Sequence, residues 1–187
     1  MRVTREQMAE NRRKILKSAG KLFRAKGFDA VTVAEVMQAA GLTHGGFYGH
    51  FKSKDDLIAE TLDDLIAETL AEAVKIKEGG VDLAAFTKRY LSKQHRDDFA
   101  GGCSTAGLAA ETIRQAPEVR TAMTTGLSET IARFSKAAPG KTAAERRRNA
   151  IGHWAAMVGG LVLARSSDDL KLSDEILSET RAWLEER

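Results

Sequence analysis

Residues 32–56 read TVAEVMQAAGLTHGGFYGHFKSKDD, and this stretch combines a capped helix with a tight glycine turn. Thr32 and Glu35 have the spacing of a capping box, in which two side chains satisfy free N–H groups at the start of a helix. The apolar residues that follow recur at helical spacing and share one face: Val33, Val36, Met37 and Ala40. Gly41 ends the helix, because a residue without a Cβ enters the left-handed region at little cost.

A second short helix is predicted directly after this turn. Thr43 is placed to cap it, and Leu42 and Phe47 flank the cap as a hydrophobic staple. Phe51 follows Phe47 by about one helical turn, so both rings are expected to face inward. Two short helices joined by a tight glycine turn form a helix-turn-helix.

Three glycines weaken this second helix: Gly45, Gly46 and Gly49. Each costs about 1 kcal/mol relative to alanine in a helix interior, so helix propensity does not account for them. A bare helical face lets a partner approach the backbone closely, whereas the plainer interpretation is a poorly formed, loop-like segment. Hydrogen-bond donors that suit phosphates on either side of a groove flank the glycines: Tyr48, His50, Lys52 and Lys54. We therefore favour DNA as the partner.

This stretch resembles, without a gap, the signature of the tetracycline-repressor (TetR) family. The resemblance covers roughly the first third of the chain. It implies that five residues contact DNA phosphates: Thr32, Thr43, Tyr48, His50 and Lys54. It also implies that three residues lie against base edges: His44, Gly45 and Gly46. The chain departs from the family at Gly46, where a small hydroxyl or alanine is frequent, and at Gly49, where a bulky or polar side chain is frequent.

The N-terminal segment adds a basic helix. Thr4 and Gln7 form a capping box that opens this helix, which is expected to run to Gly27. Three arginines near its start are expected to contact phosphates: Arg2, Arg5 and Arg12. Four other cations are interpreted mainly as a solvated face: Arg13, Lys17, Lys21 and Arg24. Residues 1–54 hold 11 Lys or Arg and 4 Asp or Glu, whereas residues 55–187 hold 18 and 22, so the basic end suits a polyanion.

The whole chain is predicted to be all-α. Residues 1–54 are expected to form a three-helix helix-turn-helix DNA-binding domain, and residues 55–187 an all-helical effector-binding and dimerisation domain. The sequence DDLIAETL occurs twice in tandem, at residues 55–62 and 63–70. Eight residues advance a helix about 80° beyond two full turns, so the two copies present their apolar faces in different directions. This connecting helix must therefore be covered on a broad front, unless the repeat is a neutral duplication. Gly79 and Gly80 are expected to end it.

Composition limits the other classes of protein. Cys103 is the single cysteine among 187 residues, so no internal disulfide can form. No apolar run approaches 18 residues and the charged N-terminus is not followed by a hydrophobic stretch, so neither a membrane span nor a secretory signal is expected. We expect a cytoplasmic protein without a metal or other cofactor.

The body carries apolar stripes that could enclose a small-molecule effector. The resemblance places the effector cavity among its helices, and Cys103 near the start of a helix that lines this cavity. Because few charged residues lie on these stripes, a mostly apolar effector is expected. The candidate effector-binding residues are Phe86, Tyr90, Cys103, Met123, Phe134 and Trp154.

The last two helices resemble the dimer-forming pair of the family. The first of them has an apolar stripe and a second stripe of small residues, which permits close approach of a partner helix. The expected dimer interface consists of Ile151, Trp154, Val158, Val162, Ile176 and Trp183, with Ser173 as the cap of the final helix. The alternative is that these helices simply close a monomeric bundle.

The sequence therefore favours a homodimeric repressor that a small effector releases from a palindromic double-stranded DNA operator. A first alternative is a repressor that senses oxidants or electrophiles through Cys103, although a lone cysteine on an apolar stripe is usually inert. A second is a small enzyme with Cys103 as nucleophile and His95 or His153 as base, but no recognisable catalytic arrangement surrounds them. A third is a constitutive architectural protein without an effector cavity.

Overall fold

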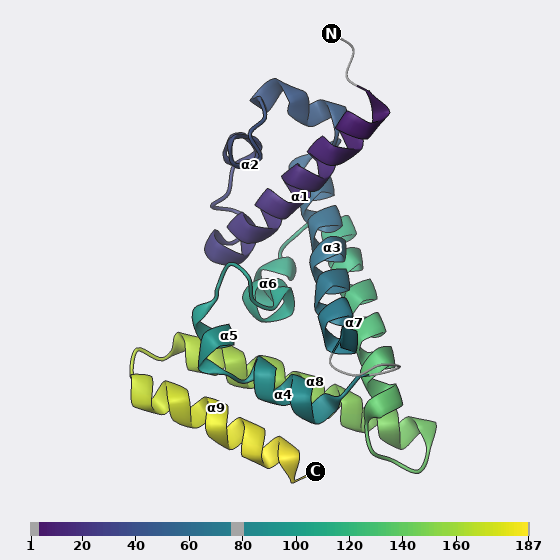
Figure 1. The fold of residues 1–187 in the computed structure, drawn as a ribbon, viewed down its shortest axis with the longest axis vertical. Coiled ribbons are helices and arrows are strands. Elements are labelled where there is room, and N and C mark those ends of the chain that lie inside the picture. Colours follow the sequence, from purple (N-terminus) through teal and green to yellow (C-terminus); the bar gives the residue numbers. More distant parts are fainter. Residues whose placement is uncertain (1–3, 76–80, 187) are drawn as a thin grey trace.

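The computed structural model describes residues 4–75 and 81–186, and within these ranges the chain is helical without strands. The all-α prediction is confirmed. Figure 1 shows a head made of the first helices at one end of the molecule and a body made of the later helices at the other. The elements in chain order are α1 (Arg5–Lys26), α2 (Val33–Ala39), the 3-10 helix η1 (His44–Gly49), α3 (Lys54–Lys75), α4 (Leu83–Tyr90), α5 (Lys93–Asp97), α6 (Ser104–Thr112), α7 (Pro117–Ala137), α8 (Ala143–Ser166) and α9 (Leu170–Glu185).

Local capping signals fix the helix starts in the head. The Thr4 hydroxyl accepts a hydrogen bond from Gln7 N at 3.1 Å, and the Thr32 hydroxyl accepts one from Glu35 N at 3.2 Å. The acidic half of the second capping box is missing, because the Glu35 carboxylate pairs with Lys26 instead. Gly41 has a φ of 72°, which is the left-handed turn that the sequence predicts.

The second helix of the motif differs from its prediction. It is a 3-10 helix, and the Thr43 side chain makes no capping hydrogen bond although the residue occupies the cap position. Three of the six residues of η1 are glycines, and their low helix propensity explains why a tighter, shorter helix replaces a regular α-helix here. Phe47 and Phe51 face inward as predicted, and their rings stack with centroids 5.7 Å apart.

Helix α3 connects the head to the body and is covered on two sides. Both copies of the tandem repeat bury their apolar residues: Leu57, Ile58 and Leu62 in the first, and Leu65, Ile66 and Leu70 in the second. A Cβ on Gly20 of α1 would lie 2.9 Å from the Leu65 side chain, and one on Gly126 of α7 would overlap Ile66. Helices α1 and α7 therefore pack closely against different faces of α3, which confirms the predicted broad coverage. The expected stop at Gly79 and Gly80 lies outside the described residues.

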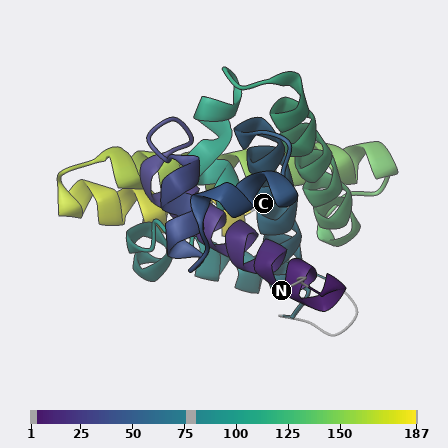
Figure 2. The same cartoon turned by 90° about the horizontal axis from the view of Figure 1, so that it is seen from above.

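Two hydrophobic cores organise the molecule. The first joins the head to the adjacent part of the body, because Leu108, Val119 and Met123 pack with the aromatic residues of α1 and η1. The second lies in the far part of the body, where Phe86, Tyr90, Phe134 and Trp154 meet edge to face. Seen from above in Figure 2, the head lies over the middle of the body.

Helices α8 and α9 lie side by side at the end of the molecule opposite the head (Figure 1). The predicted capping box of Thr142 and Glu145 opens α8. The predicted cap of α9 is wrong: Asp169 caps this helix and accepts a hydrogen bond from Lys171 N at 2.8 Å. Ser173 is instead buried within α9, where its hydroxyl donates to Ala164 O at 2.7 Å.

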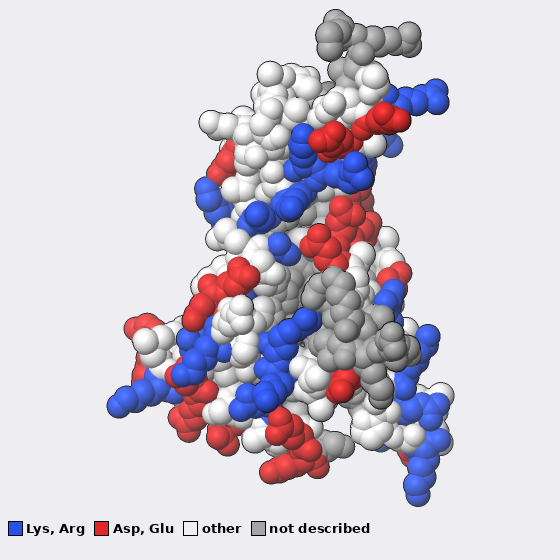
Figure 3. Space-filling view, viewed as in Figure 1, with Lys and Arg blue, Asp and Glu red and all other residues white. Residues whose placement is uncertain are grey.

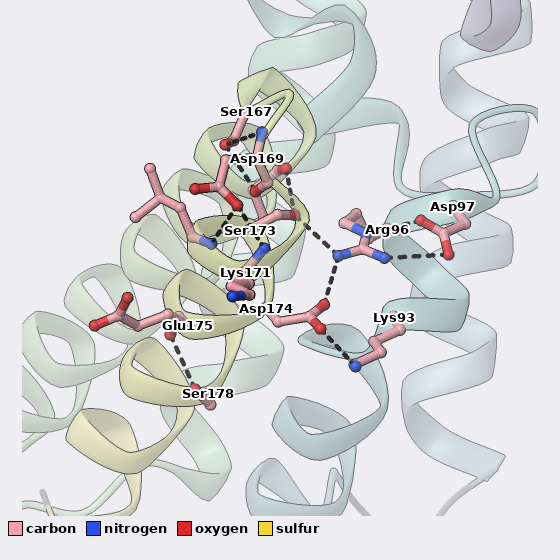
Figure 4. Close-up of polar contacts among 12 residues, drawn as sticks. Lys93, Arg96, Asp97, Ser167, Asp169, Lys171, Ser173, Asp174, Glu175 and Ser178 are labelled. Carbon is pink, nitrogen blue, oxygen red and sulfur yellow. Dashed lines mark hydrogen bonds and ion pairs between the residues drawn. The ribbon is translucent and has the colours of Figure 1, made fainter.

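A polar cluster fastens the short helix α5 to α9 (Figure 4). The Arg96 guanidinium donates to Ser173 Oγ at 2.9 Å and to Asp174 Oδ1 at 2.8 Å. Lys93 pairs with the other oxygen of Asp174, and Asp97 pairs with the opposite side of Arg96. Because Arg96 is buried and its charge is met by two carboxylates, α5 is held in a defined place next to the α8–α9 pair.

No helix among the described residues is both long enough and apolar enough to traverse a lipid bilayer.

Candidate nucleic-acid interface and internal cavity

The helix η1 presents its polar and glycine residues to solvent. Phe47 is buried, whereas Thr43, His44, Gly45, Gly46 and Tyr48 are exposed, and Tyr48 leaves 73% of its surface accessible. The inward rings of Phe47 and Phe51 therefore hold η1 with its outer face free. This is the geometry that insertion of a short helix into a groove requires.

The fold does not require glycine at the bare face of η1. Gly45, Gly46 and Gly49 all lack a positive φ. Among the described residues, a Cβ on Gly45 or Gly49 would meet no atom within 4 Å outside its own neighbours, and one on Gly46 would meet Met37 Cε at 3.6 Å and Thr43 Oγ1 at 3.9 Å. Alanine would fit all three positions and favour the helix. Within the part of the chain that the structure describes, packing and backbone conformation therefore give no reason for these three glycines.

A hollow of about 330 Å³ lies along this bare face. Four of the predicted DNA-contacting residues line it: Thr43, Gly45, Gly46 and His50. Burial, and then the nearby Arg12 guanidinium, lower the pKa of His50. The other four do not line the hollow: Thr32, His44 and Tyr48 are exposed elsewhere on the head, and Lys54 is half-buried at the start of α3. The prediction of DNA contacts stays a prediction for all eight.

Arg12 has an internal role that differs from the expected phosphate contact. Its guanidinium donates to His50 O, pairs with Glu60 of α3 and lies over the Phe51 ring at 4.3 Å from the centroid. Arg12 thus links α1, the end of η1 and α3. Arg5 is exposed at the start of α1, and Arg2 lies outside the described residues.

Exposed cations lie along α1. Arg13, Lys14, Lys17 and Lys21 are exposed along this helix, and Figure 3 shows the blue side chains over the head on the face displayed. Some acidic side chains lie among them, for example Glu10, which pairs with Lys14. The head thus carries exposed positive charge along α1, which would attract a phosphate backbone over several ångströms.

A cavity of about 340 Å³, partly open to solvent, lies between the head and the body. Phe86, Tyr90 and Cys103 line it, as the sequence predicted for an effector site. The other three predicted residues lie elsewhere: Met123 belongs to the core shared with the head, and Phe134 and Trp154 pack behind Phe86 and Tyr90 in the second core. The rest of the lining is largely polar and was not predicted: Arg24, Glu68, Thr69, Arg89, Ser92, Gln94, His95 and Asp98.

Two arginines hold residues 95–103, a segment called the loop below, which supplies several residues of the cavity wall. Arg24 of α1 donates from Nε to Ala100 O at 2.6 Å. Arg165 of α8 donates to His95 O at 2.8 Å, to Arg96 O at 3.0 Å and to Asp98 O at 3.2 Å. The pKa of each arginine is lowered, chiefly by burial. The loop is therefore attached to the head on one side and to the body on the other.

His95 fixes the same loop from within. Its Nδ1 lies 2.7 Å from Tyr90 O, and the Cys103 backbone N–H donates to its Nε2 at 3.0 Å. A carbonyl can only accept and a backbone N–H can only donate, so the proton of this neutral ring lies on Nδ1. Burial is the main cause that lowers the pKa of His95. Both ring nitrogens are thus engaged by backbone groups, and the ring does not act as a base toward the Cys103 thiol.

Helix α6 connects this cavity to the head. Cys103 precedes its first residue, and Glu111 near its end accepts a hydrogen bond from the Phe28 backbone N–H at 2.7 Å. Gly27, with a φ of 83°, leaves the space that the Glu111 carboxylate occupies, and a Cβ there would overlap it. A displacement of α6 would therefore move or break the contact with the turn at the end of α1.

The face predicted for dimerisation is partly exposed. Ile151, Val162 and Trp183 are exposed, and Val158 and Ile176 are half-buried. Trp154, which was assigned both to this face and to the cavity, is buried in the second core. Three exposed leucines on the same helices or between them were not predicted: Leu163, Leu170 and Leu172. Gly152 and Gly159 of α8 have open space at their Cβ positions, so a partner helix could approach there.

The sequence of the head matches known bacterial regulatory proteins. The family described as "Bacterial regulatory proteins, tetR family" matches residues 15–61, which include α2 and η1. The chain is 41% identical over 59 residues to the HTH-type transcriptional regulator AcrR of Shigella flexneri, which is 32% of this chain and 27% of that protein. It is 35% identical over 62 residues to the HTH-type transcriptional regulator TtgR of Pseudomonas putida, which is 33% and 30%. The chain thus spans about a third or less of these curated relatives.

Solved structures resemble the chain over nearly its whole length. The reduced form of NemR from E. coli superposes with a TM-score of 0.75 at 23% identity and covers 94% of this chain and 95% of that one. A TetR-family transcriptional regulator from Agrobacterium tumefaciens superposes with a TM-score of 0.76 at 20% identity and covers 96% and 98%. At these identities the likeness concerns the fold, and it extends beyond the head to the arrangement of the body helices.

Proposed function

We propose that this chain, which belongs to the tetR family of bacterial regulatory proteins, represses transcription as a homodimer that a small ligand releases from operator DNA. The exposed, glycine-bare face of η1 carries the proposal. Alanine would fit at Gly45, Gly46 and Gly49, so the glycines are best explained by a partner that must approach the backbone. We assign DNA binding to residues 1–54 and regulation to residues 55–187.

DNA recognition would divide between two kinds of contact. Thr32, Thr43, Tyr48, His50 and Lys54 would position the head on phosphates, which carry no sequence information. His44, Gly45 and Gly46 would lie against base edges in the major groove. Because the bare face offers few side chains, sequence preference would depend on His44 and on close backbone approach.

Dimerisation would occur through α8 and α9. The exposed apolar residues of this pair, Val162, Leu163 and Leu170 among them, support this assignment. A symmetric dimer would present two recognition helices to a two-fold symmetric site, with half-sites about one DNA turn, roughly 34 Å, or a multiple of it apart.

Ligand response would act through the cavity between head and body. Arg24 joins the cavity wall to α1, and Glu111 joins α6 to the turn after α1. A ligand that moves either link would reorient the heads of the dimer and change the separation of the two recognition helices, which a rigid duplex tolerates poorly. A coupling of about 1–3 kcal/mol would weaken operator binding about 5- to 150-fold, and by linkage the operator would weaken ligand binding by the same factor.

Selection of bound fragments from random DNA tests the proposal. We expect enrichment of inverted repeats that bind two chains, and an affinity that falls steeply as salt rises. Enrichment of no sequence, together with equal affinity for all fragments at moderate salt, would contradict a sequence-specific repressor and favour an architectural protein.

A second candidate is a repressor that responds to electrophiles through Cys103. The observation that favours it is the position of Cys103 on the cavity wall. In such a reaction the thiol would lose its proton and its sulfur would add to a carbon–carbon double bond conjugated to a carbonyl group; the π bond would break and the carbon next to the carbonyl would take up a proton. A Cys103→Ser protein that releases DNA with an electrophile as the parent does would exclude this candidate.

A further inference from the structure

We propose that the cavity between head and body binds a small organic carboxylate, and that Arg24 is the residue that recognises the carboxylate group. The proposal rests on the ligand-responsive function proposed above and specifies the chemistry of its ligand. It changes the expectation of a mostly apolar effector to that of an amphipathic anion.

Arg24 is the least exposed of the Lys, Arg, Asp and Glu residues that line the cavity. Glu68, Arg89 and Asp98 line the cavity but are exposed, whereas Arg24 is half-buried. The Asp98 carboxylate is also occupied, because its Oδ1 accepts a hydrogen bond from Gly101 N at 2.7 Å. Arg24 is therefore the cation that the cavity wall shields best, and the acidic residues around it are open to water.

The charge of Arg24 is not neutralised by an ion pair with a described side chain. Nε donates to the neutral carbonyl of Ala100. Among the described side chains, which exclude those of residues 72–80, no carboxylate lies within 4 Å of the guanidinium, and its terminal nitrogens donate to no acceptor. Burial lowers the pKa of Arg24 more than the distant Glu68 and Asp98 raise it. Two parallel N–H groups without a partner beside a cavity match the geometry of a carboxylate.

Apolar and aromatic side chains form another part of the cavity wall. Leu65, Phe86 and Tyr90 supply apolar and aromatic surface next to Arg24. The Tyr90 hydroxyl is buried and makes no hydrogen bond to a nitrogen or oxygen of the described residues. Burial, and then the neighbouring Cys103 thiol, raise its pKa well above the usual value, so it keeps its proton. A cavity of about 340 Å³ lies at the small end of the roughly 300–1,000 Å³ range of ligand sites, which suits one ring or a short chain.

Recognition by Arg24 would have a direct effect on the head. Arg24 belongs to α1, and the same guanidinium holds Ala100, which precedes the lining residue Gly101. A carboxylate that draws this guanidinium into the cavity competes with the Ala100 carbonyl and loosens a link between head and body. The Arg24 side chain would then both recognise the ligand and transmit its binding to the head.

Direct binding measurements on the full-length protein without DNA test this proposal. The probes are benzoate, phenylacetate and hexanoate, each compared by calorimetry with its neutral amide and with the amine of the same skeleton. We expect at least one carboxylate to bind about tenfold or more tightly than its amide and its amine, since a charge-assisted pair contributes more than a neutral hydrogen bond. Equal binding of carboxylates and amides, or no binding of any carboxylate at millimolar concentration, would overturn the proposal.

Two variants and a control assign the effect to Arg24. Arg24→Gln keeps a donor for Ala100 but removes the charge, so the preference for carboxylates should disappear; a preference that persists would overturn the role of Arg24. Arg24→Lys keeps the charge and should retain part of the preference, which separates charge recognition from damage to the fold. Lys21→Gln, at an exposed position of the same helix, should leave the preference unchanged.

DNA release is measured separately, so that the two proposals can fail independently. Carboxylate binding that depends on Arg24 but leaves operator affinity unchanged would support the site and contradict the switch. Operator release by a ligand whose binding is the same in the parent and in Arg24→Gln would support the switch and contradict the site.

Discussion

The Glu111 carboxylate accepts a hydrogen bond from the Phe28 backbone N–H at 2.7 Å and so joins the end of α6 to the turn that follows α1. Phe28 is fully buried while Glu111 is in place, and this carboxylate is the acceptor of its N–H. An unsatisfied buried donor costs about 1–3 kcal/mol. This contact, together with Arg24 and Ala100, connects the cavity wall to the head.

Replacement of Glu111 tests this connection. Glu111→Ala should increase the rate of amide hydrogen exchange at Phe28 and the neighbouring residues of the turn, because the N–H loses its acceptor. Glu111→Gln retains a carbonyl oxygen and should preserve most of the protection. Equal exchange rates in the parent and in Glu111→Ala would show that the contact does not hold the turn.

Alanine substitutions at the glycines of η1 should have opposite effects on stability and on DNA binding. Gly45→Ala and Gly49→Ala should each stabilise the protein by about 0.5–1 kcal/mol in urea unfolding, because there is space for a Cβ and no positive φ. The same substitutions should weaken binding to the selected operator. Gly41→Ala is the control: its φ of 72° is unfavourable for alanine, so this substitution should destabilise the fold. Unchanged operator affinity in both stabilised variants would remove the bare face from the interface.

Phosphate and base contacts should separate in their sequence dependence. Lys54→Ala and Tyr48→Phe should weaken binding to all DNA sequences to a similar degree, and Lys54→Ala should reduce the slope of log affinity against log salt by about 1. His44→Ala should instead alter the preferred bases in a repeated selection. A Lys54→Ala protein with the parental affinity and salt slope would exclude Lys54 from the site.

A charge on the exposed face of α8 should disrupt the dimer. Leu163→Glu should yield monomers in light scattering and greatly reduced operator affinity, because Leu163 is 60% exposed on the apolar face of this helix. Ile113→Glu provides a control, since Ile113 is 73% exposed and is the C-cap of α6, outside α8 and α9. If Leu163→Glu and Val162→Glu both remain dimeric, the interface lies elsewhere.

Acidification should destabilise the protein through His95. Burial lowers the pKa of His95 in the folded state below its ordinary value near 6.5, so the unfolded chain binds the proton more readily. The stabilisation is present above about pH 6.5 and is lost as pH falls toward the lower folded pKa, with at most about 1.4 kcal/mol per pH unit for one proton. A protonated ring would also direct Nε2–H at the Cys103 N–H.

Urea unfolding at several pH values between about 7.5 and 5.5 measures this dependence. His95→Gln should show a smaller loss of stability on acidification than the parent. Some loss should remain in the variant, because burial lowers the pKa values of His50 and His153 as well. Identical pH dependence in parent and variant would show that His95 is not protonated on unfolding in this range.

Short-range patterns in the sequence predicted most of the fold. The caps at Thr4, Thr32 and Thr142 form between residues three apart, so their spacing alone specifies them. The tandem repeat predicted a helix covered on two sides, and the left-handed turn at Gly41 followed from its residue type. Two predicted caps were wrong: the Thr43 side chain makes no capping hydrogen bond to η1, which is a 3-10 helix, and Ser173 does not cap α9 because Asp169, four residues earlier, does so.

Long-range packing determined the cavity and its links to the head. Arg24 meets Ala100 across 76 positions and Phe28 meets Glu111 across 83, and no local spacing relates such pairs. On the sequence, Arg24 is indistinguishable from the exposed cations Lys17 and Lys21 of the same helix. Trp154 likewise belongs to an apolar stripe whose periodicity indicates burial but not the element that buries it. Periodicity defines the face of a helix, whereas the neighbour that covers this face depends on how the whole chain packs.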